Sequence, residues 1–343
     1  MPERNTMKKI QELQQVKGDA YDYYIAGNED TDLFEKIFLV DDIVEEICKP
    51  DKYFLIGEKG SGKTAYSVYM SKSDKINSFC SISLVENTLY QRFLNMKRQK
   101  ALELSSFKDV WINLIYLILA EKIRKEYGET FFSSIKYKQL SKAIDVFYSD
   151  AFKPEFVNAF EFVDNACASI NSMMKQGLFS TGTKASAETS QKYVEQSFQI
   201  SLLKIRDGFE KAFMSVNLKK PTILFVDGID ARPRDIDNEQ YFECLVGLVN
   251  AVLEMNQSFL KEKQIKIMLL IRPDIMYKMP VHNMNQKLRN NSVLLNWVTS
   301  YRKYIDSKLF KIADDYFMKQ QDYSYELGEC WNYYFPYKVE YQE

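Results

Sequence analysis

A glycine-rich loop between an apolar run and a helical segment constrains this chain more than any other feature of its sequence. The apolar run spans residues 53–56, and the helical segment spans residues 65–70. The loop between them has the spacing G-x-x-x-x-G-K-[ST]: Gly57, Glu58, Lys59, Gly60, Ser61, Gly62, Lys63 and Thr64. This order of strand, glycine loop and helix predicts a phosphate-binding loop.

The chemistry of phosphate binding explains the residue types in this loop. Backbone N–H groups must turn inward around a phosphate, and glycines allow that turn without a Cβ in the way. The helix that follows directs its positive N-terminal end at the anion. We therefore expect the loop residues together with Ala65 to contact a nucleotide. The Lys63 ammonium is expected on its β- and γ-phosphates, and the Thr64 hydroxyl on Mg²⁺.

A second apolar run ends in a carboxylate and predicts the other half of a nucleotide site. Residues 223–226 are apolar, and Asp227 follows them. A buried parallel strand is apolar on both faces, and its carboxyl end opens on the ligand crevice. Asp227 is therefore expected to hold Mg²⁺, usually through a water molecule. Without the phosphate loop, the same residue would fit a buried strand with an ordinary capping aspartate equally well.

A further predicted strand, residues 265–271, ends in Arg272-Pro273-Asp274. A polar residue at the tip of a strand beside the phosphate loop can sense the γ-phosphate or transmit its loss, and Arg272 is the candidate for that role. An ion pair between Arg272 and Asp274 is an equally good interpretation.

The remaining segments complete an α/β chain with a large helical insertion. Strands are also predicted at 76–84 and 292–297, and one helix is predicted from about Leu33 to Ile47. The segment that separates the two motifs is amphipathic and mostly helical. We therefore expect N-terminal helices with the first part of the core (1–86), a helical insertion or lid (87–219), the second part of the core (220–300) and a helical, aromatic-rich C-terminal cap (301–343).

The composition limits the classes of function. A formal net charge of −1 argues against a highly basic nucleic-acid coat protein but leaves a local basic groove open. The five cysteines include no C-x-x-C pair and the one histidine is His282, so neither a Cys/His zinc site nor a His-based triad is expected. The N-terminal residues lack the apolar core of a signal peptide, and the apolar run 111–120 fits a buried helix better than a membrane span. We therefore expect a cytoplasmic chain with reduced thiols.

Three other features each have two interpretations. The basic residues 96–100 could contact a nucleic-acid backbone, although a solvated helix face is the more usual explanation. His282 is better explained as a loop residue beside Pro280 than as a functional group. The C-terminal aromatic residues form either a packed cap, which is favoured, or a surface for another protein or a second copy of the chain: Tyr323, Tyr325, Trp331, Tyr333, Tyr334, Phe335, Tyr337 and Tyr341.

Together these motifs resemble the additional-strand P-loop ATPases, the broad group that includes the AAA+, STAND and KAP branches. The likeness rests on residues 57–64, 226–232 and 269–275, of which the second is similar to the DDLDR signature of KAP and STAND proteins. It covers the ATPase core, about residues 30–70 and 220–300. The resemblance implies ATP and Mg²⁺ as ligands. It also implies a parallel sheet in the order 5-1-4-3-2, with a further strand between those that carry the two motifs.

Another part of the chain is similar to a little-characterised set of bacterial P-loop ATPases, several of which lie in anti-phage loci. Residues 285–289 have the pattern N-x-K-L-R, and residues 295–297 have the pattern L-x-W. This resemblance implies prokaryotic defence against phage. It also implies a partner effector, because the chain contains no nuclease motif or other toxic-enzyme motif.

The chain departs from this group next to the Mg²⁺ aspartate. These ATPases usually place an acidic residue there to polarise the attacking water, but here the position is Gly228. Asp230 could take that role; otherwise hydrolysis would be slow or would need a residue from another subunit. No position is an obvious arginine finger, and four remain open: Arg232, Arg234, Arg272 and Arg289.

The expected function is a Mg²⁺-dependent ATPase that changes shape or assembles with its nucleotide state, as a homo-oligomer, with a protein effector, or both. Its expected catalytic residues are Lys63, Asp227, Asp230 and Arg272, and its metal ligands are Thr64 and Asp227. Three alternatives remain: a nucleic-acid-stimulated ATPase, a nucleotide-gated scaffold with little turnover, and a small-molecule kinase.

Overall fold

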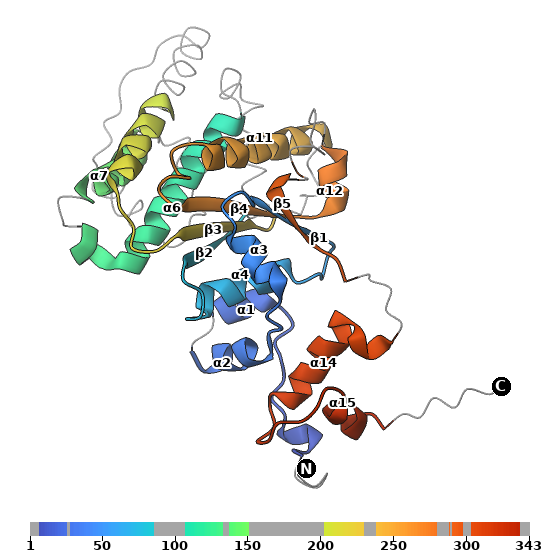
Figure 1. Ribbon diagram of the computed structural model, residues 1–343. Coiled ribbons are helices and arrows are strands. Elements are labelled where there is room, and N and C mark those ends of the chain that lie inside the picture. Colours follow the sequence, from blue (N-terminus) through green and yellow to red (C-terminus); the bar gives the residue numbers. More distant parts are fainter. Residues whose placement is uncertain are drawn as a thin grey trace, which may run out of the picture. The chain divides into compact units, whose positions relative to one another are not determined.

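The structure is a computed structural model, and it describes residues 7–25, 28–85, 107–132, 137–150, 202–229, 238–279, 288, 290–297 and 303–336. Within these ranges the chain is an α/β protein whose sheet is flanked by helices (Figure 1). The basic residues 96–100 and His282 lie outside the described residues.

A five-stranded parallel sheet organises the chain, with the strand order β2-β3-β4-β1-β5. The strands are β1 (Phe54–Gly57), β2 (Phe79–Leu84), β3 (Thr222–Asp227), β4 (Ile265–Ile271) and β5 (Ser292–Leu295). Every residue of β3 and β4 is buried, as expected for strands that are apolar on both faces. Each run that was predicted as a strand overlaps one in the structure, and β4 has the predicted bounds.

The chain divides into two compact units, and each is described by itself below. The first consists of Met1–Lys49, Leu55–Ile76 and Val293–Glu343. It contains the glycine loop. The second consists of Pro50–Phe54 and Asn77–Ser292. It contains β2, β3 and β4.

In the second unit, two long helices pack closely on each other. They are α6 (Phe107–Phe132) and α11 (Asn238–Gln257). A Cβ on Gly247 of α11 would lie 2.6 Å from the Phe107 Cβ, so only glycine fits at this approach. The Trp111 indole N–H donates to the Cys244 carbonyl oxygen at 3.1 Å, which adds a polar contact between the same helices. Residues 110–120 are all buried, which confirms the prediction of a buried helix for this apolar run.

The described part of the predicted insertion is helical and packs through aromatic rings. It includes α7 (Lys138–Asp150) and the helical residues 202–215. The Tyr116 ring of α6 stacks on Phe209 and Phe213, with centroid distances of 5.9 and 5.6 Å. Helix α7 adds Phe147, whose ring lies 6.0 Å from that of Phe209. These contacts bury the apolar faces of the helices against α6.

A buried asparagine completes the hydrogen bonding of β4 on the edge opposite β3. The Leu269 N–H donates to the Tyr53 carbonyl just before β1 begins. Two residues earlier, Asn256 of α11 takes the place of a strand. Its side-chain oxygen accepts from the Ile267 N–H at 2.9 Å, and its amide donates to the Ile267 carbonyl at 2.8 Å. The Asn256 side chain therefore satisfies backbone groups that burial would otherwise leave unpaired.

The first unit begins with short helices, and here one prediction was wrong. The stretch from Leu33 to Ile47 forms two helices, α2 (Asn28–Ile37) and α3 (Asp42–Cys48), which follow α1 (Ala20–Ile25). The predicted single helix is interrupted before Asp41, because the Asp41 side chain accepts from the Ile43 N–H and caps α3. In the break, the Phe38 ring stacks on Tyr69 of α4 (Lys63–Lys72) at 4.3 Å. Packing of this ring on α4 accompanies the interruption of the helical pattern.

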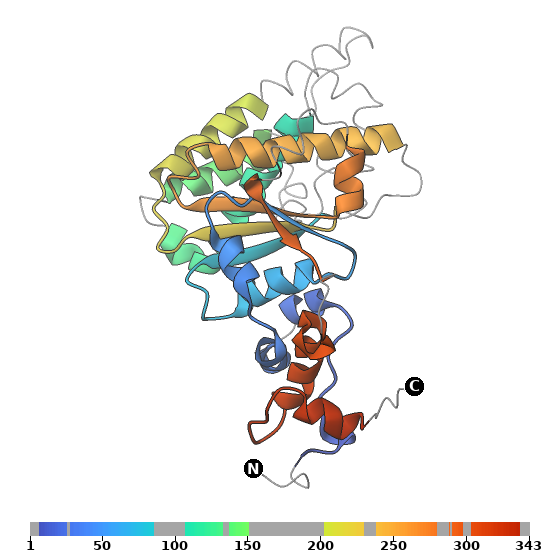
Figure 2. The same cartoon turned by 45° about the vertical axis from the view of Figure 1, so that its right-hand side comes forward.

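The C-terminal helices lie beside the N-terminal segment (Figures 1 and 2), and aromatic residues of the C-terminal part pack on residues of that segment. This part contains η2 (Ile10–Glu12), η3 (Tyr304–Asp306), α14 (Lys308–Met318) and α15 (Glu329–Tyr334). Met7, Leu13, Phe317 and Cys330 form its buried centre. The Tyr334 hydroxyl donates to the Lys8 carbonyl at 2.6 Å, more than three hundred positions away in sequence. The favoured interpretation, a packed cap, is confirmed for the aromatic residues of α15.

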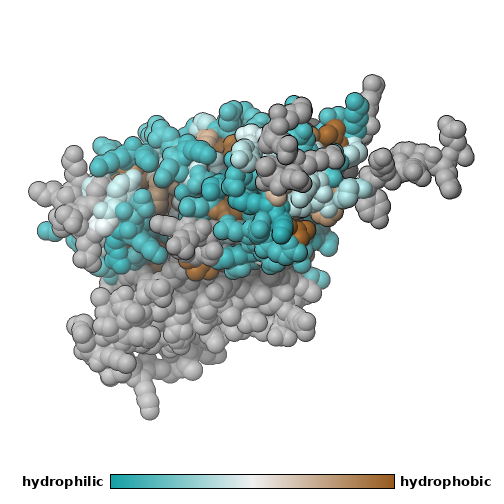
Figure 3. All heavy atoms as spheres, turned by 90° about the horizontal axis from the view of Figure 1, so that it is seen from below, coloured by the Kyte–Doolittle hydropathy of each residue, from teal (hydrophilic) through white to brown (hydrophobic). Residues whose placement is uncertain are grey.

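No helix among the described residues is long and apolar enough to cross a membrane. The face seen from below is mainly hydrophilic where it is coloured, and its hydrophobic residues are scattered (Figure 3).

Candidate functional site

The glycine loop of the first unit is a tight turn between β1 and α4. Gly60 and Gly62 have φ values of +80° and +89°, a region that other residues rarely adopt. The Ser61 N–H donates to the Glu58 carbonyl at 3.1 Å, which closes the turn. In the described part of the chain, the N–H groups of Gly60 and Gly62 donate to no protein acceptor. Successive residues with left-handed and right-handed backbone conformations are typical of anion-binding concavities.

The Lys63 side chain folds back over the start of the loop. Its ammonium donates to the carbonyl oxygens of Gly57 and Glu58, at 2.9 and 3.2 Å. Lys63 is buried although it is charged, so these carbonyls compensate part of the cost of desolvation. The loop therefore holds a positive charge beside its backbone N–H groups.

The interior of the loop is filled by Ser61 and leaves no room for a side chain on Gly57. A Cβ on Gly57 would lie 2.2 Å from Ser61 Oγ and 3.0 Å from the Leu295 Cβ of β5. Ser61 is only 4% exposed, and its hydroxyl has no hydrogen-bond partner among the described residues. A buried hydroxyl without a partner is costly, so the loop offers another donor to an anion.

Trp297, which follows β5, holds the loop from outside. Its indole N–H donates to the Ser61 carbonyl at 2.8 Å, across 236 positions of sequence. The L-x-W pattern of the sequence includes this tryptophan, but nothing in the sequence indicates which residue it contacts. A contact between distant segments has no local signature.

Behind the loop, α4 is tied to other parts of the first unit. Thr64 lies in its first turn, and its carbonyl accepts from the Ser67 hydroxyl at 2.8 Å. The Tyr66 hydroxyl donates to the Asp41 carboxylate at 2.9 Å, and the Lys308 ammonium of α14 donates to the same carboxylate at 2.7 Å. Burial and the Asp41 charge raise the pKa of Tyr66. Asp41 therefore links the helix of the loop to the C-terminal cap.

In the second unit, Asp227 is the last residue of β3 and is buried. Its side-chain oxygen accepts from the Gly228 N–H at 2.7 Å, and its carbonyl accepts from the Val85 N–H at 2.8 Å. Gly228 has φ +85°, and a Cβ there would lie 2.9 Å from the Val85 carbonyl oxygen. An acidic side chain would therefore be strained and crowded at this position, which explains the glycine in physical terms.

Arg272 lies just after β4 and forms the ion pair that was one of its two interpretations. Its Nε and Nη2 donate to the two carboxylate oxygens of Asp274, at 2.9 and 2.8 Å. This bidentate ion pair lies at the start of α12 (Pro273–Lys278). Four other candidates lie outside the described residues: Asp230, Arg232, Arg234 and Arg289.

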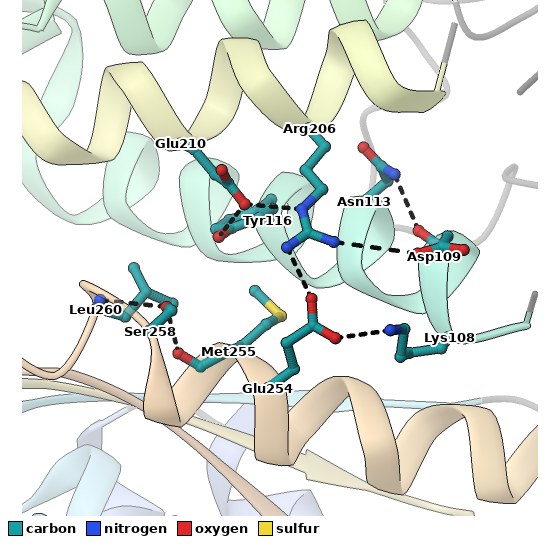
Figure 4. A network of polar contacts seen from close by, with 10 residues as sticks. All are labelled: Lys108, Asp109, Asn113, Tyr116, Arg206, Glu210, Glu254, Met255, Ser258 and Leu260. Atoms are coloured by element: carbon teal, nitrogen blue, oxygen red, sulfur yellow. Dashed lines mark hydrogen bonds and ion pairs between the residues drawn. The ribbon is translucent and has the colours of Figure 1, made fainter. Parts of the chain in front are cut away.

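A second polar cluster, the Arg206 cluster, joins three helices of the second unit (Figure 4). Arg206 donates to Glu210 at 2.8 Å and to Glu254 of α11 at 2.7 Å. On α6, Lys108 pairs with Glu254 at 2.7 Å, and the Tyr116 hydroxyl donates to Glu210 at 3.5 Å. Burial works against the charge of Arg206, but both carboxylates together raise its pKa. Sequence reasoning missed this cluster, because its members are spread over distant helices.

The structure thus brings together the loop residues, Thr64 and Trp297 in the first unit. It places Asp227 and Arg272 at the carboxyl ends of β3 and β4 in the second. Comparison of the chain with protein-family models, with curated proteins and with solved structures finds no match.

Proposed function

We propose that this chain is a Mg²⁺-dependent P-loop ATPase that switches or assembles with its nucleotide state. The observation that carries the proposal is the loop itself. It combines two glycines of positive φ, whose N–H groups donate to no acceptor in the described part of the chain, with an ammonium held over the same turn. The Ser61 hydroxyl, which also has no partner among those residues, adds a further donor. These donors fit the oxygens of a polyphosphate.

In this proposal the loop N–H groups and Lys63 hold the phosphates. Thr64 and Asp227 would hold Mg²⁺, which neutralises charge on the phosphates when bound. The sheet order supports the assignment, because β2-β3-β4-β1-β5 read from its other edge is the expected 5-1-4-3-2. Parallel strands present their carboxyl ends at one edge of a sheet, where open α/β folds bind ligands.

Arg272 would read the loss of the γ-phosphate, and its ion pair sets a condition on that role. The guanidinium is already engaged with Asp274. To contact a phosphate it must either leave that carboxylate or use its remaining donors. Exchange between carboxylate and phosphate would give Arg272 two defined positions, as a switch requires.

A nucleotide-gated scaffold with little turnover is the second candidate, and Gly228 favours it. The backbone at this position excludes the acidic side chain that would polarise a water molecule. Hydrolysis would then depend on Asp230 or on a residue from another subunit. The wider role, anti-phage defence with a partner effector, rests on the sequence resemblance alone.

Phosphate release from ATP and Mg²⁺ tests the proposal, with and without DNA or RNA, beside Lys63→Ala. Lys75→Ala is the matched control, because it removes an exposed lysine that lies outside the loop. Turnover that is lost in Lys63→Ala, kept in Lys75→Ala and indifferent to nucleic acid supports the switch. Turnover that rises many-fold with nucleic acid supports a nucleic-acid-stimulated ATPase instead.

Three other outcomes each have a distinct meaning. Turnover that requires an added small-molecule acceptor would indicate a kinase. ATP-dependent assembly without phosphate release would select the scaffold. Absence of ATP binding by the wild-type chain would overturn the proposal altogether.

A further inference from the structure

We propose that Trp297 is a positioning residue for the phosphate loop, an assignment that rests on the proposed ATPase function. The argument uses only the first unit, in which the loop and Trp297 both lie. It begins with the single hydrogen bond from the indole N–H to the Ser61 carbonyl at 2.8 Å.

This bond fixes the orientation of the peptide between Ser61 and Gly62. A trans peptide is planar, and its carbonyl oxygen and N–H point in opposite directions. Because the Ser61 carbonyl is held toward Trp297, the Gly62 N–H is directed to the opposite side of the loop. Gly62 directly precedes α4, and its N–H donates to no acceptor among the described residues. Trp297 thus aims a donor at the position proposed for the phosphate.

The glycine makes this restraint necessary. At φ +89° Gly62 has no Cβ to limit its backbone, so the peptide before it can rotate more readily than at other residues. The Ser61 N–H, which bonds back to Glu58, belongs to the preceding peptide and so restrains that peptide instead. An indole is rigid, and it has one donor at a fixed place on its ring. Trp297 therefore restrains the rotation of this peptide, which the glycine leaves free.

Strand β5 places the tryptophan at the loop. A Cβ on Gly57 would lie 3.0 Å from the Leu295 Cβ. The end of β5 therefore packs directly against the start of the loop. Trp297 follows two residues later and is half-buried. The end of β5 and the loop are therefore one packed arrangement, in which the strand supports the backbone that binds phosphate.

Trp297→Phe tests this role, because phenylalanine keeps a ring but lacks the N–H donor. Affinity for MgATP and MgADP should fall by the same factor, about fivefold to tenfold, because both ligands have the β-phosphate and one neutral hydrogen bond is lost. The thermal midpoint without nucleotide should stay at the wild-type value. Trp331→Phe is the matched control, since Trp331 lies in the C-terminal aromatic cluster, and it should bind both nucleotides normally.

Tryptophan emission gives a second measurement. Saturating MgATP should change the emission of the wild type and of Trp331→Phe, but not that of Trp297→Phe. If Trp297→Phe does not fold, Trp297→Leu replaces it, because leucine is apolar and also has no donor. Wild-type affinity in the Trp297 variant would overturn the positioning role, and so would an affinity loss accompanied by a clearly lower midpoint. If the wild type and Trp331→Phe bind no nucleotide, the proposed function itself fails.

Discussion

The glycine loop and the Arg206 cluster are both polar sites, but the loop is local and leaves donors unsatisfied, whereas the cluster is assembled from distant helices and is satisfied internally. Among the described residues, the Gly60 and Gly62 N–H groups and the Ser61 hydroxyl of this short segment have no partner. In the Arg206 cluster each charged group already has an oppositely charged partner, and Arg206 and Glu254 lie 48 positions apart. Unsatisfied donors predict a ligand, whereas satisfied charges predict a structural role. The comparison therefore supports the proposed ligand binding at the loop and indicates a role in helix packing for the Arg206 cluster.

The largest expected effect is on ligand binding, from Gly57→Ala. The new Cβ would overlap Ser61 Oγ and press on Leu295, so the loop would have to open. We expect affinity for MgATP to fall roughly 100-fold, in keeping with the few kcal/mol that overpacking costs. Titration calorimetry measures this change. Gly18→Ala is the matched control, because a Cβ there meets no atom within 4 Å. Nearly normal ATP affinity in Gly57→Ala would show that the loop does not bind phosphate.

The same contrast explains what could be predicted from the sequence. The loop was predictable because its chemistry lies in consecutive residues, and the buried strands β3 and β4 were predictable because they are uninterrupted apolar runs. The Arg206 cluster and the bond from Trp297 to Ser61 were not, because each depends on the tertiary packing of distant segments. The break before α3 was also missed. There the apolar stripe continues through Phe38, whereas the Asp41 side chain ends the helix by capping the next one.

Gly228 was only partly predictable from the sequence. The sequence shows that a glycine stands where an acidic residue was expected, but it gives no reason for the exchange. The positive φ and the nearby Val85 carbonyl supply that reason. Asp230, the proposed substitute, lies outside the described residues. A departure from a motif can be found in sequence, whereas its physical cause lies in the backbone.

Gly57→Ala is expected to act mainly on MgATP affinity, whereas Arg206→Met should act on stability alone. Methionine keeps part of the side-chain volume but leaves Glu210 and Glu254 without their shared partner. We expect the free energy of unfolding to fall by about 1–2 kcal/mol, less than for a fully buried pair because these groups are partly exposed. MgATP affinity should not change. Urea unfolding and calorimetry measure the two quantities.

Arg124→Met is the control for that prediction. Arg124 pairs with Glu121 one turn away on α6, and 38% of its side chain is exposed. The loss of unfolding free energy should be below about 0.5 kcal/mol. Equal losses in the two arginine variants would mean that the Arg206 cluster holds the helices no better than an ordinary surface pair.

Gly208→Ala should raise the free energy of unfolding, whereas the crowded Cβ of Gly57→Ala should lower it. Gly208 lies among the helical residues 202–215, and a Cβ there meets no atom within 4 Å. Alanine is a better helix former, so unfolding free energy should rise by about 0.5–1 kcal/mol. Chemical denaturation of the two glycine variants, side by side, measures this difference. Destabilisation by Gly208→Ala would show that the helix requires glycine for a reason other than open space.

The smallest expected effect is a pH dependence that belongs to the Arg206 cluster. Burial alone would raise the pKa of Glu254, but Lys108 and Arg206 more than compensate, so its pKa lies below the usual value. A carboxyl group with a lowered pKa stabilises the fold above its unfolded pKa, and the contribution is lost as the pH falls through its folded pKa. The difference in unfolding free energy between wild type and Glu254→Gln should therefore be largest near neutral pH and shrink below about pH 4. In an Arg206→Met background the difference should be smaller at every pH, because one of the two cations that lower the pKa is gone. A difference that stays constant from pH 7 to pH 3 would mean that the Glu254 charge does not stabilise the cluster.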